Sequence, residues 1–337
     1  MIDPDIVAFA ARHYGVSAEE LKLSAVPLGG GLCATALRVR TRFLNPAHRP
    51  RTAAFVVKAL STCDVREIAA YHMVVNRFCV TQAPKLLGSQ TLPDGSGRLY
   101  LEWVQPWRPW PWTDESLIAR VVEALAVLHT SVSVQDFCAR LSEWDYETEL
   151  QRSAEDTLEY FELVLNDPQH HGLRRLLSPL RRVVASLPRL RRALLLEAVA
   201  VLHGDAHPGN IVVRLLGKRK QPVLLDWARV RLGSPLEDVN SWLHALGFWE
   251  SIAHRRHDML LRRYLAASGR SATLGSDFRD TYAAARASNA LAGAMKYHLV
   301  NMTRAELPEE TRRQAEAYVR DWGRNIVRAA SCCRVGS

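Results

Sequence analysis

The sequence predicts an α+β chain with two lobes, a small β-rich N-terminal lobe at residues 1–104 and a larger, mostly helical C-terminal lobe at residues 105–337. Short runs of β-forming residues separated by glycine and proline dominate the first hundred residues. Beyond a linker dense in proline and tryptophan at residues 105–112, apolar residues recur mostly at helical spacing. A length of 337 residues with 48% hydrophobic content can support both lobes.

The N-terminal lobe is predicted to begin with an amphipathic helix at residues 3–13. Five strands follow, and a helix at residues 64–79 comes after the third strand. The strands are expected at residues 21–28, 34–43, 53–60, 85–88 and 98–104. Gly29-Gly30-Gly31 joins the first two strands, and a hinge to the second lobe is expected near residues 102–106.

The C-terminal lobe is predicted to be helical except for a loop and a strand pair around residues 203–226. Helices are expected at residues 114–130, 146–166, 173–187, 193–202, 236–249, 253–267, 277–300 and 308–330. Trp107, Trp110 and Trp112 are expected to fix the linker to one lobe, and a lid over a ligand is the alternative role for them.

Composition indicates a soluble, cytoplasmic protein with no membrane partner. We find no secretory signal and no apolar run long enough to span a bilayer, and the six cysteines contain no C-x-x-C pair. The net charge of +9 comes largely from arginine pairs spread over several predicted helices. We therefore expect solvated helix faces, with no nucleic acid bound, and the sequence does not predict an oligomeric state.

Three oxygen-bearing side chains carry the predicted chemistry. Asp205 and Asn210 lie in the loop 203–210, and Asp226 directly follows the apolar run at residues 223–225. Asp205 is the candidate base, because a carboxylate can accept the hydrogen bond and later the proton of a substrate hydroxyl. Asn210 and Asp226 supply the hard oxygens that Mg²⁺ prefers. This set predicts phosphoryl transfer from a nucleoside triphosphate to a hydroxyl group.

Groups that hold a triphosphate are predicted in the N-terminal lobe. Backbone N–H groups of Gly29, Gly30 and Gly31 can approach phosphate oxygens, although a simple turn has the same composition. Lys58 stands in an apolar strand, where an unpaired ammonium is costly, and Glu67 on the next helix is its expected partner. Such a pair would present the ammonium to the α- and β-phosphates.

The segment His203–Asn210 resembles the H-G-D-x-x-x-x-N loop of the aminoglycoside phosphotransferase and choline kinase-like family, relatives of the protein kinases. The resemblance implies a bilobal protein-kinase-like fold with ATP and Mg²⁺ as cofactors, and GTP is kept as an alternative nucleotide. It implies that Asp205 is the catalytic base and that Asn210 and Asp226 bind magnesium. It also implies that the backbones of Glu102 and Val104 bind the adenine edge.

Three departures distinguish this chain from protein kinases. His207 stands where protein kinases have lysine, and Trp227-Ala228 follows Asp226 in place of Phe-Gly. Only a dozen residues separate Asp226 from Asp238, the residue that resembles the family's second buried aspartate. This interval leaves no room for a long activation segment, and the chain resembles a small-molecule kinase.

The acceptor is expected to be neutral or acidic. A polycationic aminoglycoside needs a dense acidic wall, whereas acidic residues after 236 are scattered and outnumbered by arginine. Aromatic residues such as Trp242 and Tyr282 favour a flat or sugar-like acceptor, although each has helix packing as its alternative role. A nucleoside- or glycoside-type antibiotic, inactivated for resistance, is the leading hypothesis. A metabolic kinase of the choline, homoserine or thiosugar type and a non-catalytic nucleotide-binding pseudokinase are the alternatives.

Overall fold

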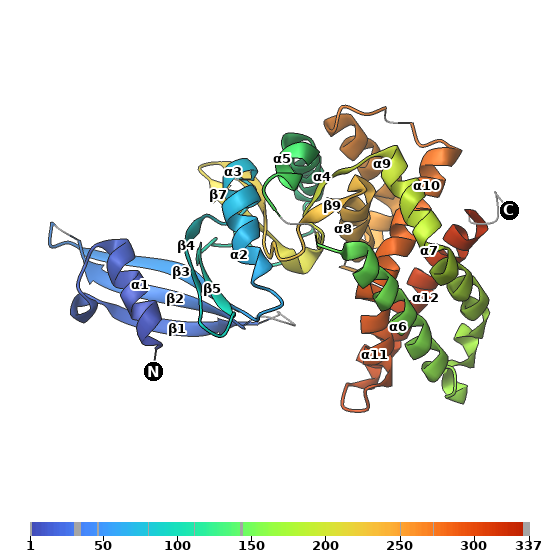
Figure 1. Ribbon diagram of the computed structural model, residues 1–337, viewed down its shortest axis with the longest axis horizontal. Helices are drawn as coiled ribbons and strands as arrows, with labels where there is room; N and C mark the ends of the chain where they lie inside the picture. The colour runs from blue at the N-terminus through green and yellow to red at the C-terminus, as the bar shows by residue number, and fades with distance from the viewer. Residues whose placement is uncertain are drawn as a thin grey trace. The chain divides into compact units, whose positions relative to one another are not determined.

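The computed structural model describes residues 2–29, 35–45, 47–79, 81–110, 112–141, 144–249, 251–271 and 273–332. The chain forms two compact units, drawn in Figure 1. Unit 1 contains residues 1–124, 136–141 and 208–230, and unit 2 contains residues 125–135, 142–207 and 231–337. The sequence predicted a boundary between two lobes at residues 104 and 105, where a hinge is expected. That boundary stays a prediction.

Unit 1 is built on a five-stranded antiparallel sheet with the strand order β1-β2-β3-β5-β4. The strands are β1 (Lys22–Leu28), β2 (Thr35–Leu44), β3 (Pro50–Leu60), β4 (Leu86–Thr91) and β5 (Gly97–Glu102). Helix α1 (Pro4–Tyr14) lies across one face of this sheet (Figure 1). Ile6 and Phe9 of the helix pack there on Val39, Phe55 and Tyr100. Because side chains alternate along a strand, the neighbours of these residues point to the other face.

The rest of unit 1 consists of short elements around the sheet. Residues 66–78 form one helical stretch in three parts, α2 (Arg66–Ala70), the π-helical η2 (Tyr71–Val75) and α3 (Asn76–Phe78). A short 3-10 turn, η1 (Ala18–Glu20), precedes β1, and another, η4 (Pro208–Asn210), precedes a hairpin of β7 (Ile211–Leu216) and β8 (Arg219–Leu224). Helices α4 (Glu115–Ser131) and α5 (Val134–Cys138) contain residues of both units.

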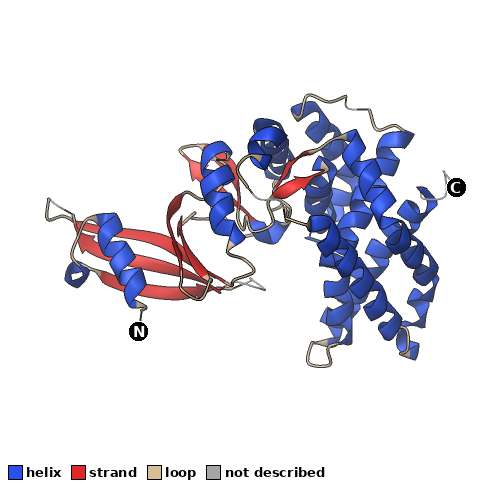
Figure 2. Ribbon diagram, in the orientation of Figure 1, coloured by secondary structure: helices blue, strands red, loops and turns tan. Residues whose placement is uncertain are grey.

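Unit 2 is helical apart from a two-stranded pairing of β6 (Ala200–Leu202) with β9 (Arg231–Gly233), as Figure 2 shows. Its first helices are α6 (Tyr146–Val164), η3 (Pro168–Leu176) and α7 (Leu177–Glu197). After β9 come α8 (Pro235–Trp249), α9 (Ser251–Ala267), α10 (Ser276–Asn289), η5 (Ala290–Ala294), α11 (Met295–Thr303) and α12 (Glu309–Cys332). The predicted α+β class is thus confirmed, with strands concentrated in unit 1 and helices in unit 2.

Two predicted helices were wrong in their bounds. The sequence predicted helices at residues 173–187 and 193–202, but α7 runs unbroken from Leu177 to Glu197 with Pro188 inside it. Residues 200–202 form the buried strand β6, whose backbone pairs with β9. A short apolar run fits a buried helix and a buried strand equally well, and only the partner strand, about thirty residues later, decides between them.

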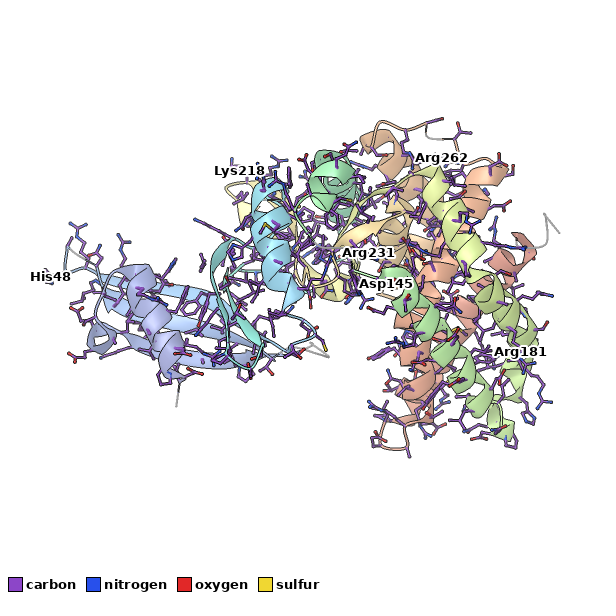
Figure 3. The ribbon with its side chains drawn as sticks, viewed as in Figure 1. His48, Asp145, Arg181, Lys218, Arg231 and Arg262 are labelled. Atoms are coloured by element: carbon purple, nitrogen blue, oxygen red, sulfur yellow. The ribbon has the colours of Figure 1, made fainter. Side chains whose placement is uncertain are left out.

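A buried ion cluster around Glu237 joins four elements of unit 2. Arg191 Nη1 on α7 lies 2.6 Å from Glu237 Oε1 on α8, and the Ser288 hydroxyl on α10 donates to the same oxygen at 2.7 Å. Arg231, labelled in Figure 3, stands at the start of β9. Its Nη1 lies 3.5 Å from Glu237 Oε2, and its guanidinium stacks over the Tyr146 ring. Burial by itself would raise the pKa of Glu237, but the two arginines outweigh it and lower that pKa.

Among the residues that the structure describes, no helix has the length and apolar character needed to cross a membrane. Cys63, Cys79 and Cys138 are free thiols, and burial raises the pKa of Cys79 to about 12.

Replacing Gly88 by alanine is expected to lower the free energy of unfolding by about 1–3 kcal/mol, the usual cost of overpacking a core. A β-carbon at position 88 would lie 2.7 Å from Phe9 Cε2. The Phe9 ring cannot yield easily, because it stacks on Tyr100 with ring centroids 3.8 Å apart. Urea unfolding measures the effect. Gly275→Ala is the control, since nothing lies within 4 Å of its added β-carbon, and equal losses for both variants would contradict the packing.

Candidate active site

A three-residue ion cluster forms the centre of the candidate site in unit 1. Lys58 Nζ on β3 lies 2.6 Å from Glu67 Oε2 on α2 and 2.9 Å from Asp226 Oδ1. The Glu67 side chain is fully buried and that of Lys58 is 11% exposed, whereas the Asp226 side chain is 41% exposed. Burial alone would lower the pKa of Lys58, but the charges of Glu67 and Asp226 outweigh it and raise that pKa. The ammonium therefore stays charged at neutral pH.

Glu67 also fixes the backbone next to Asp226. Its second oxygen, Oε1, accepts a hydrogen bond of 3.0 Å from the backbone N–H of Trp227. Arg66, the preceding residue on α2, donates to the carbonyl of Val230 at 2.7 Å. Helix α2 is thus tied to residues 227–230, and the side chain of Asp226 is held beside Lys58.

Asp226 adopts a left-handed backbone conformation, with φ of 61°. A non-glycine residue in this region is uncommon and costs energy, so the surrounding contacts must hold it there. Strained residues of this kind cluster at functional sites. His48 is the other non-glycine residue with a positive φ in the described part of the chain, and of the two it is Asp226 that contacts Lys58.

The hairpin β7–β8 brings Asn210 and Asp226 to the same end. Asn210 directly precedes β7, Asp226 follows β8 by two residues, and Ile211 pairs with Leu224. The Leu225 N–H donates to the Asn210 carbonyl at 2.7 Å. The two predicted magnesium ligands are therefore neighbours in unit 1, on chain segments joined by a backbone hydrogen bond.

This donor set fits a magnesium ion. It offers one carboxylate and one carboxamide, both hard oxygen ligands, and Asp226 is tied to Lys58 through one carboxylate oxygen only. No cluster of three or more histidine, cysteine or acidic side chains able to hold a metal occurs within the described part of the chain. An ion at Asn210 and Asp226 thus depends on additional oxygens, as those of a nucleotide triphosphate would be.

The predicted nucleotide contacts lie in unit 1, with part of the glycine loop outside the described residues. Gly29 ends the described stretch after β1, while Gly30 and Gly31 fall outside it. The Glu102 N–H donates to the Lys85 carbonyl at 2.8 Å, so a contact of Glu102 with a base would use its carbonyl group. Val104 is buried.

Arg38 was missed by the sequence prediction. On β2 it lies opposite Val56, two residues from Ala36, which faces Lys58. Its guanidinium stacks on Trp103, 4.2 Å from the ring centroid. In the sequence, Trp103 stands between Glu102 and Val104, the two residues predicted to bind the base. The signal was present in the sequence, because alternation along the strand places Arg38 on the same sheet face as Lys58.

In unit 2, the loop that begins at His203 is held by Asp238 of α8. Asp238 accepts hydrogen bonds from the backbone N–H groups of His203, at 2.7 Å, and Gly204, at 2.9 Å. His129 Nε2 lies 3.1 Å from the same carboxylate, and its Nδ1 lies 2.8 Å from the Tyr264 hydroxyl. Burial would raise the pKa of Asp238, but the hydrogen bond and charge of His129 outweigh it, so the pKa is lowered.

Asp205 follows directly on this braced backbone. Gly204 has φ of 83°, a conformation that favours glycine and turns the chain sharply before Asp205. The Asp205 side chain is 40% exposed, and its Oδ2 lies 3.6 Å from His207 Nε2. A carboxylate on a fixed backbone that remains open to solvent can approach a substrate hydroxyl.

A five-stranded antiparallel sheet at the N-terminal side of the chain and a mostly helical C-terminal region are the architecture of a protein-kinase-like phosphotransferase. A family model described as "Phosphotransferase enzyme family" (APH) matches residues 38–288, and the chain belongs to this family. It is an enzyme that transfers a phosphoryl group from ATP to a hydroxyl group. A sequence search of curated proteins finds no match.

Solved structures share the fold at low sequence identity. A choline/ethanolamine kinase family protein from Mesorhizobium loti is 16% identical with a TM-score of 0.59, covering 93% of each chain. An aminoglycoside phosphotransferase from Alicyclobacillus acidocaldarius is 13% identical with a TM-score of 0.57, covering 99% of this chain and 96% of that one. Spectinomycin phosphotransferase, solved with ADP and spectinomycin, is 12% identical with a TM-score of 0.53, covering 99% of both chains.

Asp238→Ala is expected to lower the free energy of unfolding by about 3–5 kcal/mol, because it leaves buried N–H groups and His129 without their acceptor. Asp156→Ala is the control, since its ion pair with Lys296 is largely exposed and contributes less than about 1 kcal/mol. Urea unfolding of both variants measures the difference. If Asp238→Ala lowers the free energy of unfolding no more than Asp156→Ala does, Asp238 does not hold the loop in place.

Proposed function

We propose that the protein is a magnesium-dependent kinase of a small, neutral or acidic hydroxyl compound. The observation that carries the proposal is the contact of Lys58 with both Glu67 and Asp226, with Asn210 on the adjoining segment. A purely structural ion pair has no need of a strained, partly exposed aspartate, and carboxylate oxygens such as those of Asp226 are ligands that Mg²⁺ prefers.

Each residue has a distinct task in this proposal. Lys58, held by Glu67, donates to the α- and β-phosphates, and the backbone groups of Gly29, Gly30 and Gly31 approach the same chain of phosphates. The carbonyl of Glu102 and the N–H of Val104 bind the base edge. Asn210 and Asp226 hold Mg²⁺, which supplies charge neutralisation when bound.

Asp205 is the proposed catalytic base. Its carboxylate accepts the hydrogen bond of the acceptor hydroxyl, aims the oxygen at the γ-phosphorus and takes the proton as the bond forms. His207 lies beside it, with Nε2 3.6 Å from Asp205 Oδ2. Phosphoryl transfer needs little beyond this positioning and charge neutralisation.

The charges of unit 2 favour an acceptor that is not a polycation. Several acidic side chains after residue 236 form ion pairs with arginine side chains of the same chain, which offsets their charge and weakens their attraction for amines. Such pairs are Asp258 with Arg279, Glu306 with Arg304, Glu309 and Glu310 with Arg313, and Asp321 with Arg324. A nucleoside- or glycoside-type antibiotic remains the leading acceptor, with resistance by inactivation as the biological role.

Two of the aromatic side chains expected to favour a flat acceptor are not available for it. Trp242 and Tyr282 are buried core residues and offer no surface for an acceptor, while Tyr297 is exposed. The side chains of Phe248 and Trp249 lie outside the described residues. The case for a flat acceptor therefore rests on fewer side chains, and a metabolic alcohol kinase remains the second candidate because choline/ethanolamine kinase family proteins share the fold.

Incubation with ATP, Mg²⁺ and a panel of hydroxyl compounds is expected to add one phosphate to a neutral or acidic nucleoside or glycoside. Mass spectrometry of the panel detects the product. Kanamycin-type polyamines are the matched comparison, because they carry similar hydroxyl groups with a dense positive charge. Turnover restricted to those polyamines would contradict the charge argument.

Asp205→Ala is expected to lower kcat on the identified acceptor by at least about a hundredfold, the usual contribution of a positioned base. Nucleotide affinity should change little, because the predicted nucleotide contacts lie elsewhere in the chain. Asp226→Ala is the comparison variant, and it should weaken Mg²⁺-nucleotide binding as well. Unchanged turnover by Asp205→Ala would contradict the role of Asp205 as the catalytic base. A native protein that binds ATP but phosphorylates none of the compounds would be a pseudokinase.

A further inference from the structure

Helices α9, α10 and α12 of unit 2 line a cavity of about 60 Å³. One water molecule needs only about 10–15 Å³ of such space, so a small polyatomic ion fits. On α10 the lining side chains include Phe278, Tyr282 and Arg286, which are four residues apart and share one helix face.

The cavity wall is basic. Arg279 and Arg286 come from α10 and Arg328 from α12, and His257 of α9 adds an imidazole. Asp258 is the one carboxylate among the described lining residues, and Arg279 Nη2 lies 2.9 Å from its Oδ2. With Asp258 neutralised in this way, Arg286 still lines the cavity without a matching negative charge among the described lining residues.

Arg286 is the critical member of the cluster. Its Nε is buried and has no hydrogen-bond partner, and no carboxylate of the described residues lies within ion-pair distance of its guanidinium. Burial is the largest influence on Arg286 and lowers its pKa, while Asp321 attracts and Arg328 and Arg324 repel the charge. An arginine remains protonated in such surroundings. Arg286 is partly buried and lies 5.8 Å from the Tyr282 ring centroid, a contact that does not neutralise its charge, so an approaching anion is favoured.

The aromatic side of the cavity is rigid. Tyr282 and Phe278 are stacked with ring centroids 6.1 Å apart and planes 8° from parallel. Asn240 Nδ2 donates to the Tyr282 hydroxyl at 3.3 Å, which fixes that ring from α8. An anion held by the arginines would therefore have a fixed apolar wall on one side.

We propose that this cavity binds a small oxyanion, a phosphate or carboxylate group, between Arg286 at its buried side and the exposed side chains of Arg279 and Arg328. The planar guanidinium fork matches the oxygens of either group and can bind two of them at once. The source is a free anion or the anionic group of a larger molecule whose body lies against Phe278. This site is separate from the residues assigned to phosphoryl transfer.

Calorimetric titration of the full chain with inorganic phosphate is expected to show saturable binding that falls at least about tenfold in Arg286→Gln. Arg262→Gln is the matched control, because Arg262 lies exposed on α9 (Figure 3) and does not line the cavity. In phosphate-free buffer Arg286→Gln should be at least as stable as the native protein, since it removes an uncompensated buried charge.

Phenyl phosphate and acetate, titrated in parallel, distinguish the sources. Tighter binding of phenyl phosphate assigns the site to a phosphate ester, tighter binding of inorganic phosphate to the free anion, and tighter binding of acetate to a carboxylate. Equal phosphate affinity in the native protein and Arg286→Gln overturns the proposal, as does the absence of binding by all three probes. Should Arg286→Gln fail to fold, Arg279→Gln on the exposed side replaces it, with the same expected loss. No readout depends on turnover, so failure here leaves the proposed kinase activity untouched.

Discussion

The candidate site depends on one physical constraint, the burial of the Glu67 carboxylate. A fully buried carboxylate must be paired and hydrogen-bonded, and Glu67 meets this need through Lys58 on one oxygen and the Trp227 N–H on the other. These two bonds connect β3 and the nearby α2 to the segment after β8, which follows about 160 residues later in the sequence. Since Lys58 also contacts Asp226, its removal would leave two carboxylates facing each other without a cation. The constraint that stabilises unit 1 thus also positions Lys58 and Asp226, the groups proposed to face a nucleotide.

Unit 2 uses the same principle on adjacent residues of α8. Glu237 accepts from Arg191 of α7 and forms an ion pair with Arg231 of β9, while Asp238 accepts from the backbone of the loop before Asp205. Adjacent helix positions point about 100° apart, so one helix can serve two separate clusters. The Glu237 cluster fixes α8 against its neighbours, and that fixed helix then holds His203 and Gly204. Loss of the ion cluster would therefore disturb the loop even though neither arginine lies in it.

Much of this arrangement was predictable from the sequence because it rests on local patterns. Alternation and turn residues predicted the five strands, and a lysine in an apolar strand required the acid that Glu67 supplies. The strand β6 was not predictable, because its identity depends on pairing with β9. The burial of Trp242 and Tyr282 depends on the packing of neighbouring helices, which periodicity along one helix does not reveal. Arg38 was visible as one of the alternating arginines of β2, but its stacking on Trp103 requires the turn of the chain after β5.

The arginine excess acquires a more specific meaning from these contacts. Arg191 and Arg231 neutralise Glu237 inside the core, and several other arginines pair with acids along the helix surfaces. The arginines behind the net charge of +9 therefore do not, for the most part, form a continuous basic groove. Pairing of this kind consumes acidic side chains and disfavours a polycationic acceptor. Arg286 differs, because it is enclosed by α9, α10 and α12 without an acid at ion-pair distance among the described residues. A guanidinium beside a cavity that has no carboxylate partner can still bind an anion. A guanidinium that is already paired with a carboxylate cannot. The composition therefore bears on ligand choice through the acids that paired arginines occupy and through Arg286, which lines a cavity without an acid at ion-pair distance among the described residues.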